Sequence, residues 1–253
     1  MNKLKSVAKG QPGIALLTPL FMGVFYLGVF LFCCVAAPLH AQQPNTLTAA
    51  ERAAGWRLLF DGKTITDWRG YKLDSVPPGW TVKDGTIFKE KGVRDLMTRD
   101  QFGDFELSID WKIGTGGNSG IFYRATEEYN HIYWSGTEYQ LLDDVGADDN
   151  KETSHLAASN YALYAPTDTL AVHRANEWNT TRIVMRGAHV EHWINGKKVV
   201  EYELWSPDWQ ARVKASKFAA WPNYGLAKKG YIGIQGDHPG TLELRNIKIR
   251  ELK

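Results

Sequence analysis

The sequence predicts an all-β fold, an antiparallel β-sandwich of the jelly-roll type with one or two short helices. Apolar and polar residues alternate along 105–113, which is the period of two expected for a half-buried strand. Asp84-Gly85 and Asn195-Gly196 each separate two strand-like runs, a spacing typical of tight hairpins. Many short strands with glycine-rich turns and few helical periods favour two packed antiparallel sheets.

The same patterns place the remaining elements along the chain. Thr48 and Glu51 have the spacing of a capping box, which predicts a short helix over 48–54. Ser206 followed by Pro207 predicts a second helix that ends near residue 216. Residues 143–169 have weak periodicity, which predicts a long functional loop. We expect further strands at 56–60, 80–82, 86–88, 119–124, 138–142, 178–186, 190–194, 199–202, 231–235 and 242–251.

The first 41 residues have the pattern of a signal peptide. Three lysines precede an apolar stretch over 14–35. The small residues that follow this stretch are typical of a signal-peptidase site and predict cleavage after Ala41. The apolar stretch is long enough for an uncleaved single-span anchor, which is the alternative. We therefore expect a protein of the periplasm, the cell envelope or the exterior. Residues 42–54 are predicted to form a linker and a short helix, and residues 55–253 one β-sandwich domain.

Charge and cysteine usage limit the classes of partner. Residues 1–41 hold three lysines and no acid, so the rest of the chain has 27 basic and 28 acidic residues. This balance does not favour a nucleic-acid partner, and membrane contact is expected only through the N-terminal segment. Both cysteines, Cys33 and Cys34, lie in that segment, so the exported domain cannot form a disulfide and must rely on its core.

Three polar constellations interrupt the strand patterns: GNSGIFYR at 117–124, EYQLLDD at 138–144 and GIQGDH at 233–238. A packed sandwich does not require charged groups or amides there, whereas a site for a polar substrate on one sheet face does. The ten tryptophans and eleven tyrosines are explained mainly by packing between sheets, and a few could stack on sugar rings. The candidates for binding an oligosaccharide or glycoside substrate are Asn118, Tyr123, Gln140, Gln235 and Asp237.

Glu138, Gln140 and Asp143 have a spacing similar to the carboxylate spacing of retaining β-glucanases. One β-bulge after Gln140 would place Asp143 on the same face as the first two side chains. Two carboxylates at the separation used by retaining enzymes would then serve as nucleophile and acid. The alternative interpretation is a solvated strand face followed by aspartates that cap a loop.

Arg124, His155 and His238 complete the candidate catalytic set with Glu138 and Asp143. A guanidinium at a strand end can bind an oxyanion, or it can simply pair with Glu138. A lone loop histidine is more often a surface residue than a catalyst. Glu138, Asp143 and His155 could together hold a divalent metal ion through mixed nitrogen and oxygen donors, and no histidine or cysteine motif of a metal site supports this.

Several spaced motifs resemble the 3-keto-disaccharide hydrolase domain family over Gly55 to Leu252. They are LLFDGKTITDW, GNSGIFYR, EYQLLDD, EWNTTRIV with HWINGKKV, SKF at 216–218, and GYIGIQGDH with LRNIKIREL. The resemblance implies a concanavalin A-like jelly roll and an exported enzyme that cleaves glycosides oxidised to a ketone at C3. The sequence departs from the family pattern where Gly236 separates Gln235 from Asp237.

The implied chemistry assigns roles to the candidate residues. A ketone at C3 acidifies the proton at C2, so a base with a pKa near 7 can remove it before the group at C1 departs. The resemblance implies His155 or His238 as the base and Arg124, with or without a divalent ion, as the group that stabilises the enolate. Glu138 or Asp143 would be the acid or a metal ligand.

We expect Arg124, Glu138, Asp143, His155 and His238 to lie in one groove on the open face of the jelly roll. Two other functions fit the same fold. A non-catalytic carbohydrate-binding module needs aromatic rings and amides and does not need these five groups to converge. An ordinary two-carboxylate glycosidase should cleave the unoxidised glycoside.

Overall fold

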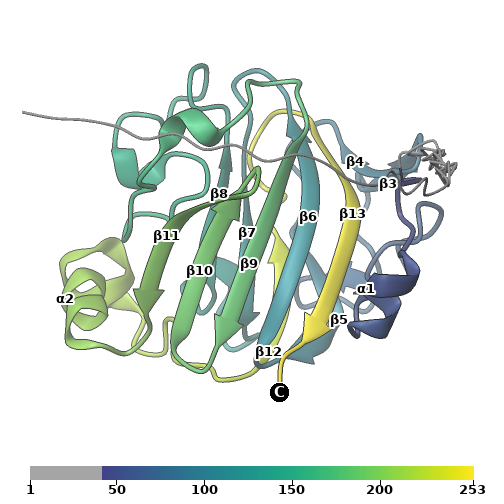
Figure 1. Cartoon of the computed structure of the whole chain (residues 1–253). Helices are drawn as coiled ribbons and strands as arrows, with labels where there is room; N and C mark the ends of the chain where they lie inside the picture. Colours follow the sequence, from purple (N-terminus) through teal and green to yellow (C-terminus); the bar gives the residue numbers. More distant parts are fainter. Residues whose placement is uncertain (1–41) are drawn as a thin grey trace, which may run out of the picture. The chain divides into compact units, whose positions relative to one another are not determined.

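Two antiparallel β-sheets pack face to face in the domain, as the alternating sequence patterns predict (Figure 1). The computed structural model describes residues 42–253, so the predicted signal peptide and its anchor alternative lie outside the described residues. The eight-stranded sheet has the order β11-β10-β9-β6-β13-β4-β3, and β1 also pairs with β13. The five-stranded sheet has the order β2-β5-β12-β7-β8. The predicted all-β sandwich is confirmed.

The larger sheet consists of β1 (Arg57–Leu58), β3 (Thr81–Lys83), β4 (Thr86–Lys89), β6 (Phe105–Ile113), β9 (Asn179–Arg186), β10 (His189–Ile194), β11 (Lys197–Glu203) and β13 (Leu242–Glu251). The smaller sheet consists of β2 (Trp68–Gly70), β5 (Leu96–Phe102), β7 (Asn118–Ala125), β8 (Thr137–Leu142) and β12 (Gly230–Ile234). The helices are α1 (Ala49–Ala53), α2 (Pro207–Ala215) and the 3-10 turns η1 (Ile132–Trp134), η2 (Thr153–His155), η3 (Thr169–Ala171) and η4 (Lys217–Ala220).

Local chemistry explains why the predicted hairpins and helices form. Asp84 and Gly85 have φ values of 49° and 73°, the left-handed conformation that both central residues of a type I′ turn require. The Thr48 hydroxyl accepts a hydrogen bond from the Glu51 N–H, and the Glu51 carboxylate accepts one from the Thr48 N–H, which confirms the capping box of α1. The sequence patterns missed β2 and β5. In β5 three buried residues are followed by three exposed ones, so no alternation marks the strand.

The core lies between the two sheets and contains a buried polar chain that joins them. The Tyr123 hydroxyl, from the smaller sheet, lies 2.7 Å from His192 Nε2 in the larger sheet. It also lies 2.7 Å from the Tyr202 hydroxyl. His192 Nδ1 donates to the Ala158 carbonyl at 2.9 Å, because a carbonyl can only accept. Nε2 is therefore the acceptor for Tyr123. Each group in this chain has a partner, which fixes how the sheets are placed.

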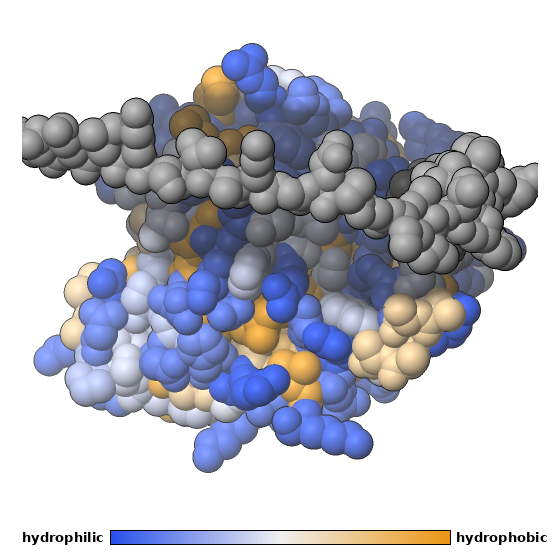
Figure 2. All heavy atoms as spheres, viewed as in Figure 1, coloured by the Kyte–Doolittle hydropathy of each residue, from blue (hydrophilic) through white to orange (hydrophobic). Residues whose placement is uncertain are grey.

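The outer face of the larger sheet carries mostly charged residues in mutual ion pairs, and hydrophilic colours dominate much of the visible surface in Figure 2. Glu106, for example, accepts hydrogen bonds from Arg182 and from Arg250. The charged side chains on this open face therefore pair with one another. The loops gather instead over the outer face of the smaller sheet, where the candidate site is found.

The predicted linker before α1 is attached to the sandwich. Asn45 donates its backbone N–H to Asn246 Oδ1 at 2.6 Å and its side-chain amide to the Gly85 carbonyl at 2.8 Å. Asn45 is itself buried. Among residues 42–253, no helix has the length and apolar character needed to cross a membrane.

Removing the buried imidazole should reduce the sensitivity of the fold to acid. Burial lowers the pKa of His192 to about 4 from 6.5, so the unfolded chain binds more protons between these values. The stability from this group is complete above pH 6.5 and falls as the pH drops toward 4, by about 3 kcal/mol in total. Urea unfolding should show this extra pH dependence in the wild type and a weaker one in His192→Gln.

The surface variant His189→Gln is the control, because the hydrogen bond that His189 donates to Glu203 raises the pKa of His189, opposite to the shift of His192. Equal acid sensitivity in the wild type and His192→Gln would contradict the assignment of a neutral, buried His192.

Candidate active site

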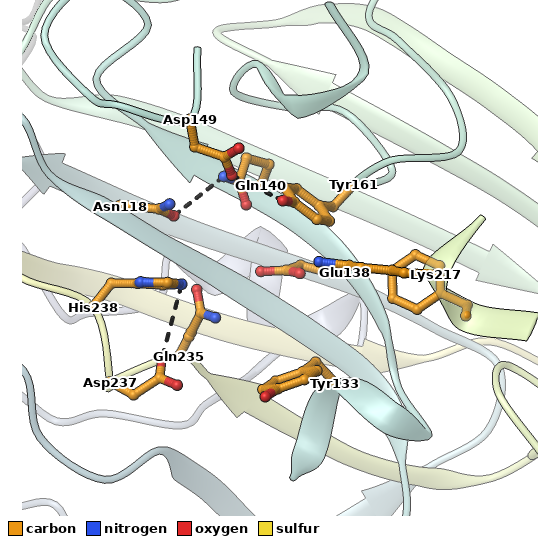
Figure 3. Close-up of a pocket in the computed structure, with 11 residues that line it drawn as sticks. Asn118, Tyr133, Glu138, Gln140, Asp149, Tyr161, Lys217, Gln235, Asp237 and His238 are labelled. Carbon is orange, nitrogen blue, oxygen red and sulfur yellow. Dashed lines mark hydrogen bonds and ion pairs between the residues drawn. The ribbon is translucent and has the colours of Figure 1, made fainter. Parts of the chain in front are cut away.

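A polar cavity of about 200 Å³ lies on the outer face of the smaller sheet (Figure 3). Its floor comes from β7, β8 and the residues that follow β12, and its walls come from η1, η4 and the long loop before β9. The cavity is lined by Asn118, Tyr133, Glu138, Gln140, Asp149, Tyr161, Lys217, Phe218, Gln235, Asp237 and His238.

Glu138 forms the floor because of the strand register. In the pairing of β7 with β8, Phe122 lies opposite Glu138 and Gly120 lies opposite Gln140, so these four residues share the outer face. A Cβ atom on Gly120 would come within 1.9 Å of Glu138 Oε1. Only glycine leaves the space that the carboxyl group occupies.

The Glu138 carboxyl group is 5% exposed, and within residues 42–253 it accepts no hydrogen bond from the protein. Its pKa is raised to about 8. Burial is the main cause, the Lys217 ammonium acts in the opposite direction, and the carboxylates of Asp95, Asp237 and Asp149 add to the increase. A carboxyl group with this pKa gains and loses a proton near neutral pH. That property is what a general base or acid requires.

Asp149 organises one wall of the cavity. It accepts a hydrogen bond from the Tyr161 hydroxyl at 2.9 Å and pairs with His155 Nδ1 at 2.8 Å. The His155 ring stacks on Tyr161 with ring centroids 4.5 Å apart. The Lys217 ammonium lies 4.4 Å from the centroid of the same tyrosine ring. Tyr161 is thus fixed between an imidazole and an ammonium, and Lys217 is held beside Glu138 (Figure 3).

Two amides supply neutral hydrogen-bonding groups. Gln140 donates to Asn118 Oδ1 at 3.2 Å across the β7–β8 pair. Gln235 is buried, and its Oε1 atom has no hydrogen-bond partner among the described residues. Buried amide oxygens are rarely left without a partner, so this atom is available to a bound ligand.

Two buried ionisable residues hold the loop that carries Asp237 and His238. Asp95 accepts a hydrogen bond from the Gly236 N–H at 2.7 Å. Lys89 donates to the carbonyls of His238 at 2.8 Å and Gly240 at 3.2 Å. Burial raises the pKa of Asp95 to about 7 and lowers the pKa of Lys89 to about 8. The His238 side chain, 4.0 Å from Asp237, is therefore presented by a fixed backbone.

Comparison with known proteins identifies the family. The model of the 3-keto-alpha-glucoside-1,2-lyase-like domain matches residues 55–250. The chain belongs to this family. It is similar to a 3-keto-disaccharide hydrolase of Bacteroides thetaiotaomicron, at 35% identity over 246 aligned residues that cover 85% of this chain and 84% of that protein.

Two crystal structures of candidate glycosyl hydrolases from Parabacteroides distasonis are also similar. The first has a TM-score of 0.78 and 35% identity over 83% of this chain and 100% of that chain. The second has a TM-score of 0.62 and 28% identity over 78% of this chain and 99% of that chain. The family resemblance predicted from the spaced motifs is confirmed.

The structure brings six of the predicted site residues of this family member into one cavity. They are Asn118, Glu138, Gln140, Gln235, Asp237 and His238. The extra glycine before Asp237 is accommodated because Gly236 lies against the carbonyls of Val93 and Arg94, where a Cβ atom would clash. The predicted position of the site, in a groove on the open face of the sandwich, is wrong, because the cavity lies beneath the loops that cover the smaller sheet.

Arg124 and Tyr123 do not reach this cavity, which corrects two predictions. The Arg124 backbone has a φ of 48°, which ends the regular alternation of β7. Its guanidinium is buried against Asp104 at 2.9 Å and against the carbonyls of Gly103 and Gly187. Tyr123 points to the opposite side of β7, into the core between the sheets. Both are structural groups here.

Asp143 and His155 also lie outside the cavity. The register of β8 with β7 is continuous, so the predicted bulge after Gln140 is absent from this pair. Asp143 instead follows the strand and accepts hydrogen bonds from the Gly116 N–H at 2.8 Å and the Val145 N–H at 3.2 Å. His155 stands behind the wall, where it contacts Asp149 and Tyr161.

The predicted metal set of Glu138, Asp143 and His155 is not assembled, because the three donors lie in different surroundings. Within residues 42–253, His189, Glu191 and Glu201 are the group whose donor atoms lie within 4.8 Å of one another. They lie on the other sheet, where the Lys198 ammonium already pairs with both carboxylates at 3.2 and 2.8 Å.

Sequence patterns missed Tyr133, Asp149, Tyr161 and Lys217 as site residues. All four lie in loops or single 3-10 turns without periodicity. Lys217 had a signal, since it stands inside the SKF motif that the family resemblance includes.

Replacing the buried carboxyl group should stabilise the fold at alkaline pH. The folded-state pKa of Glu138, about 8, exceeds the ordinary glutamate value of 4.5, so the folded form binds the proton more tightly. This stabilisation is complete below pH 4.5 and is lost as the pH rises through 8, by on the order of 5 kcal/mol. Urea unfolding of Glu138→Gln should lack this loss. An unchanged pH dependence would contradict the raised pKa.

Proposed function

We propose that this protein cleaves the glycosidic bond of glycosides whose sugar carries a ketone at C3, by deprotonation at C2, elimination and hydration. The observation that carries the proposal is the buried Glu138 carboxyl group, with a pKa of about 8, on the floor of a sugar-sized cavity. The activity named for the Bacteroides relative supports the same substrate class.

Glu138 is the base in this scheme. Its carboxylate takes the proton from C2, and the electron pair moves toward the C3 carbonyl to form an enolate. The enolate then collapses, the bond from C1 to the leaving oxygen breaks, and a double bond forms between C1 and C2. Water finally adds at C1 while C2 regains a proton, so the net reaction is hydrolysis. A pKa near 8 makes this carboxylate a much stronger base than a solvated one.

Lys217 takes the role first assigned to Arg124. Its ammonium lies at the cavity wall, and within residues 42–253 it has no carboxylate partner at 4.0 Å or less. A cation that is not neutralised by an ion pair can stabilise the negative charge that develops on the C3 oxygen. The same cation favours the charged form of Glu138 before the reaction.

His238, beside Asp237, protonates the departing oxygen. Its imidazole lines the cavity and lies 4.0 Å from the Asp237 carboxylate. The Lys89 and Asp95 contacts to the 236–240 backbone keep this ring at the same place in each catalytic cycle.

The two alternative functions fit the geometry less well. A two-carboxylate glycosidase built on Glu138 and Asp143 lacks its second group, because Asp143 is bound in a turn outside the cavity. A simple carbohydrate-binding module would gain nothing from burying a carboxyl group without a hydrogen-bond partner, since this burial costs free energy.

We further propose that the domain acts after export, in the periplasm, the cell envelope or outside the cell. The basic and apolar pattern of residues 1–41 supports this proposal. N-terminal sequencing of the protein from the producing cells should give Gln42 as the first residue. A chain that begins at Met1 in the membrane fraction would favour the anchor alternative.

Substitution of the base and of the cation should separate the reaction from binding. We expect Glu138→Gln to reduce kcat on a 3-keto-glucoside by about 10²–10⁴-fold, because the amide cannot accept the C2 proton. Lys217→Met should reduce kcat by about 10²–10³-fold. In the wild type, kcat/KM should rise as the pH increases toward about 8, because Glu138 loses its proton. Release of the leaving group from the 3-keto and unoxidised glucosides measures all three.

The control is Glu106→Gln, a buried glutamate on the other sheet, which should retain activity. Full activity in Glu138→Gln would remove this residue from the mechanism. Cleavage of the unoxidised glucoside at a similar rate would refute the elimination pathway.

A further inference from the structure

A second cavity, of about 600 Å³, adjoins the first one at Asp237. Its lining includes Tyr71, Arg94, Asp95, Asn130, His131 and Asp237. Asp237 lines both cavities, and the segment at η1 lies between them. Tyr133 lines the first cavity and His131 lines the second. The centroids of their rings are 5.1 Å apart. The two cavities therefore share one edge.

The first cavity can take only part of a disaccharide. Its volume of about 200 Å³ lies below the roughly 300–1,000 Å³ typical of pockets that enclose drug-sized ligands. It is suited to one hexose ring over Glu138. If the oxidised sugar occupies this cavity, the leaving half of the substrate must lie in a neighbouring one.

Three neighbouring cavities could receive the leaving group, and their chemistry differs. The cavity beyond Lys217 contains His155 and Arg212, whose polar atoms are already bound to Asp149, to Asp208 and to the Leu163 carbonyl. The cavity beyond Phe218 has a largely apolar lining that includes Trp209, Val213, Trp221, Pro222, Tyr224 and Leu226. A leaving sugar needs free hydrogen-bonding groups next to the proposed acid, His238. Both of these cavities meet the first one at Lys217 or Phe218, and Lys217 lies on the side of Glu138 away from His238 (Figure 3), so neither cavity offers such groups there.

The second cavity has such groups. Within residues 42–253, the side chains of Asn130 and His131 make no hydrogen bond to the protein. Arg94 uses one nitrogen for the Tyr71 carbonyl at 3.2 Å and has no carboxylate within 4.0 Å among these residues. Asp95, which is only 9% exposed, also lines this cavity. A guanidinium, an amide and an imidazole can together bind adjacent hydroxyl groups.

We propose that the second cavity binds the leaving half of the substrate and selects a sugar or another polyol there. This inference rests on the proposed function. The oxidised ring lies over Glu138, the scissile oxygen lies beside Asp237 and His238, and the hydroxyl groups of the leaving sugar contact Arg94 and Asn130. The enzyme is then adapted to 3-keto-disaccharides and not to glycosides with small alkyl leaving groups.

The test compares two substrates with the same oxidised ring. One is a 3-keto-α-glucosyl-glucose disaccharide, and the other is methyl 3-keto-α-glucoside, whose leaving group is too small to reach the second cavity. We expect Arg94→Ala and Asn130→Ala each to reduce kcat/KM for the disaccharide by about tenfold more than for the methyl glycoside. Arg212→Ala, a matched arginine in a different cavity, should change the ratio of the two values by less than about twofold.

The outcomes distinguish failure of the second binding site from failure of the proposed function. Equal losses on both substrates, or no loss in either variant, would overturn the second binding site while the wild-type activity still supports the proposed function. A wild type that cleaves neither substrate would overturn the proposed function and the binding site with it. Arg94 and Asn130 are both exposed, so two independent variants that remain folded are expected, and circular dichroism verifies this.

Discussion

The burial of one carboxyl group against a sheet surface is the constraint on which the site depends. Glu138 points away from the core of the sandwich, yet it is covered by the loops that surround the cavity. Burial of an ionisable group costs free energy, and the fold accommodates it through a missing Cβ atom at Gly120 and a nearby ammonium at Lys217. The same burial that destabilises the carboxylate in the folded state makes it a strong base.

The remaining parts of the site are held by polar contacts that have no direct chemical role. Asp149 fixes Tyr161 and, through it, the side chain of Lys217. Lys89 and Asp95 fix the loop after β12 through its backbone atoms. Lys89 and Asp95 are buried ionisable groups, and their burial costs free energy, so the position of this loop is maintained at some expense of stability.

The sequence was sufficient for the sandwich, because period-two alternation and Asp-Gly or Asn-Gly turns act within short segments. It also predicted that Glu138 and Gln140 share a face, which follows from strand geometry alone. It could not predict that the strand continues without a bulge, which removes Asp143, or that Arg124 has a positive φ, which directs it to Asp104. Asp149 and Tyr161 come from a loop whose course depends on tertiary contacts, so no local pattern marks them.

The arrangement of charge also explains why this sandwich suits elimination better than displacement. A displacement mechanism needs a second carboxyl group close to the first, and here the neighbouring acids have other contacts. Asp149 holds the wall, Asp95 holds the loop, and Asp237 lies beside His238. What faces the cavity is a single buried acid with an elevated pKa and an ammonium beside it. A base and a cation without a nucleophile pair can remove a proton next to a carbonyl group and stabilise the resulting enolate, and the ketone of the substrate supplies that carbonyl.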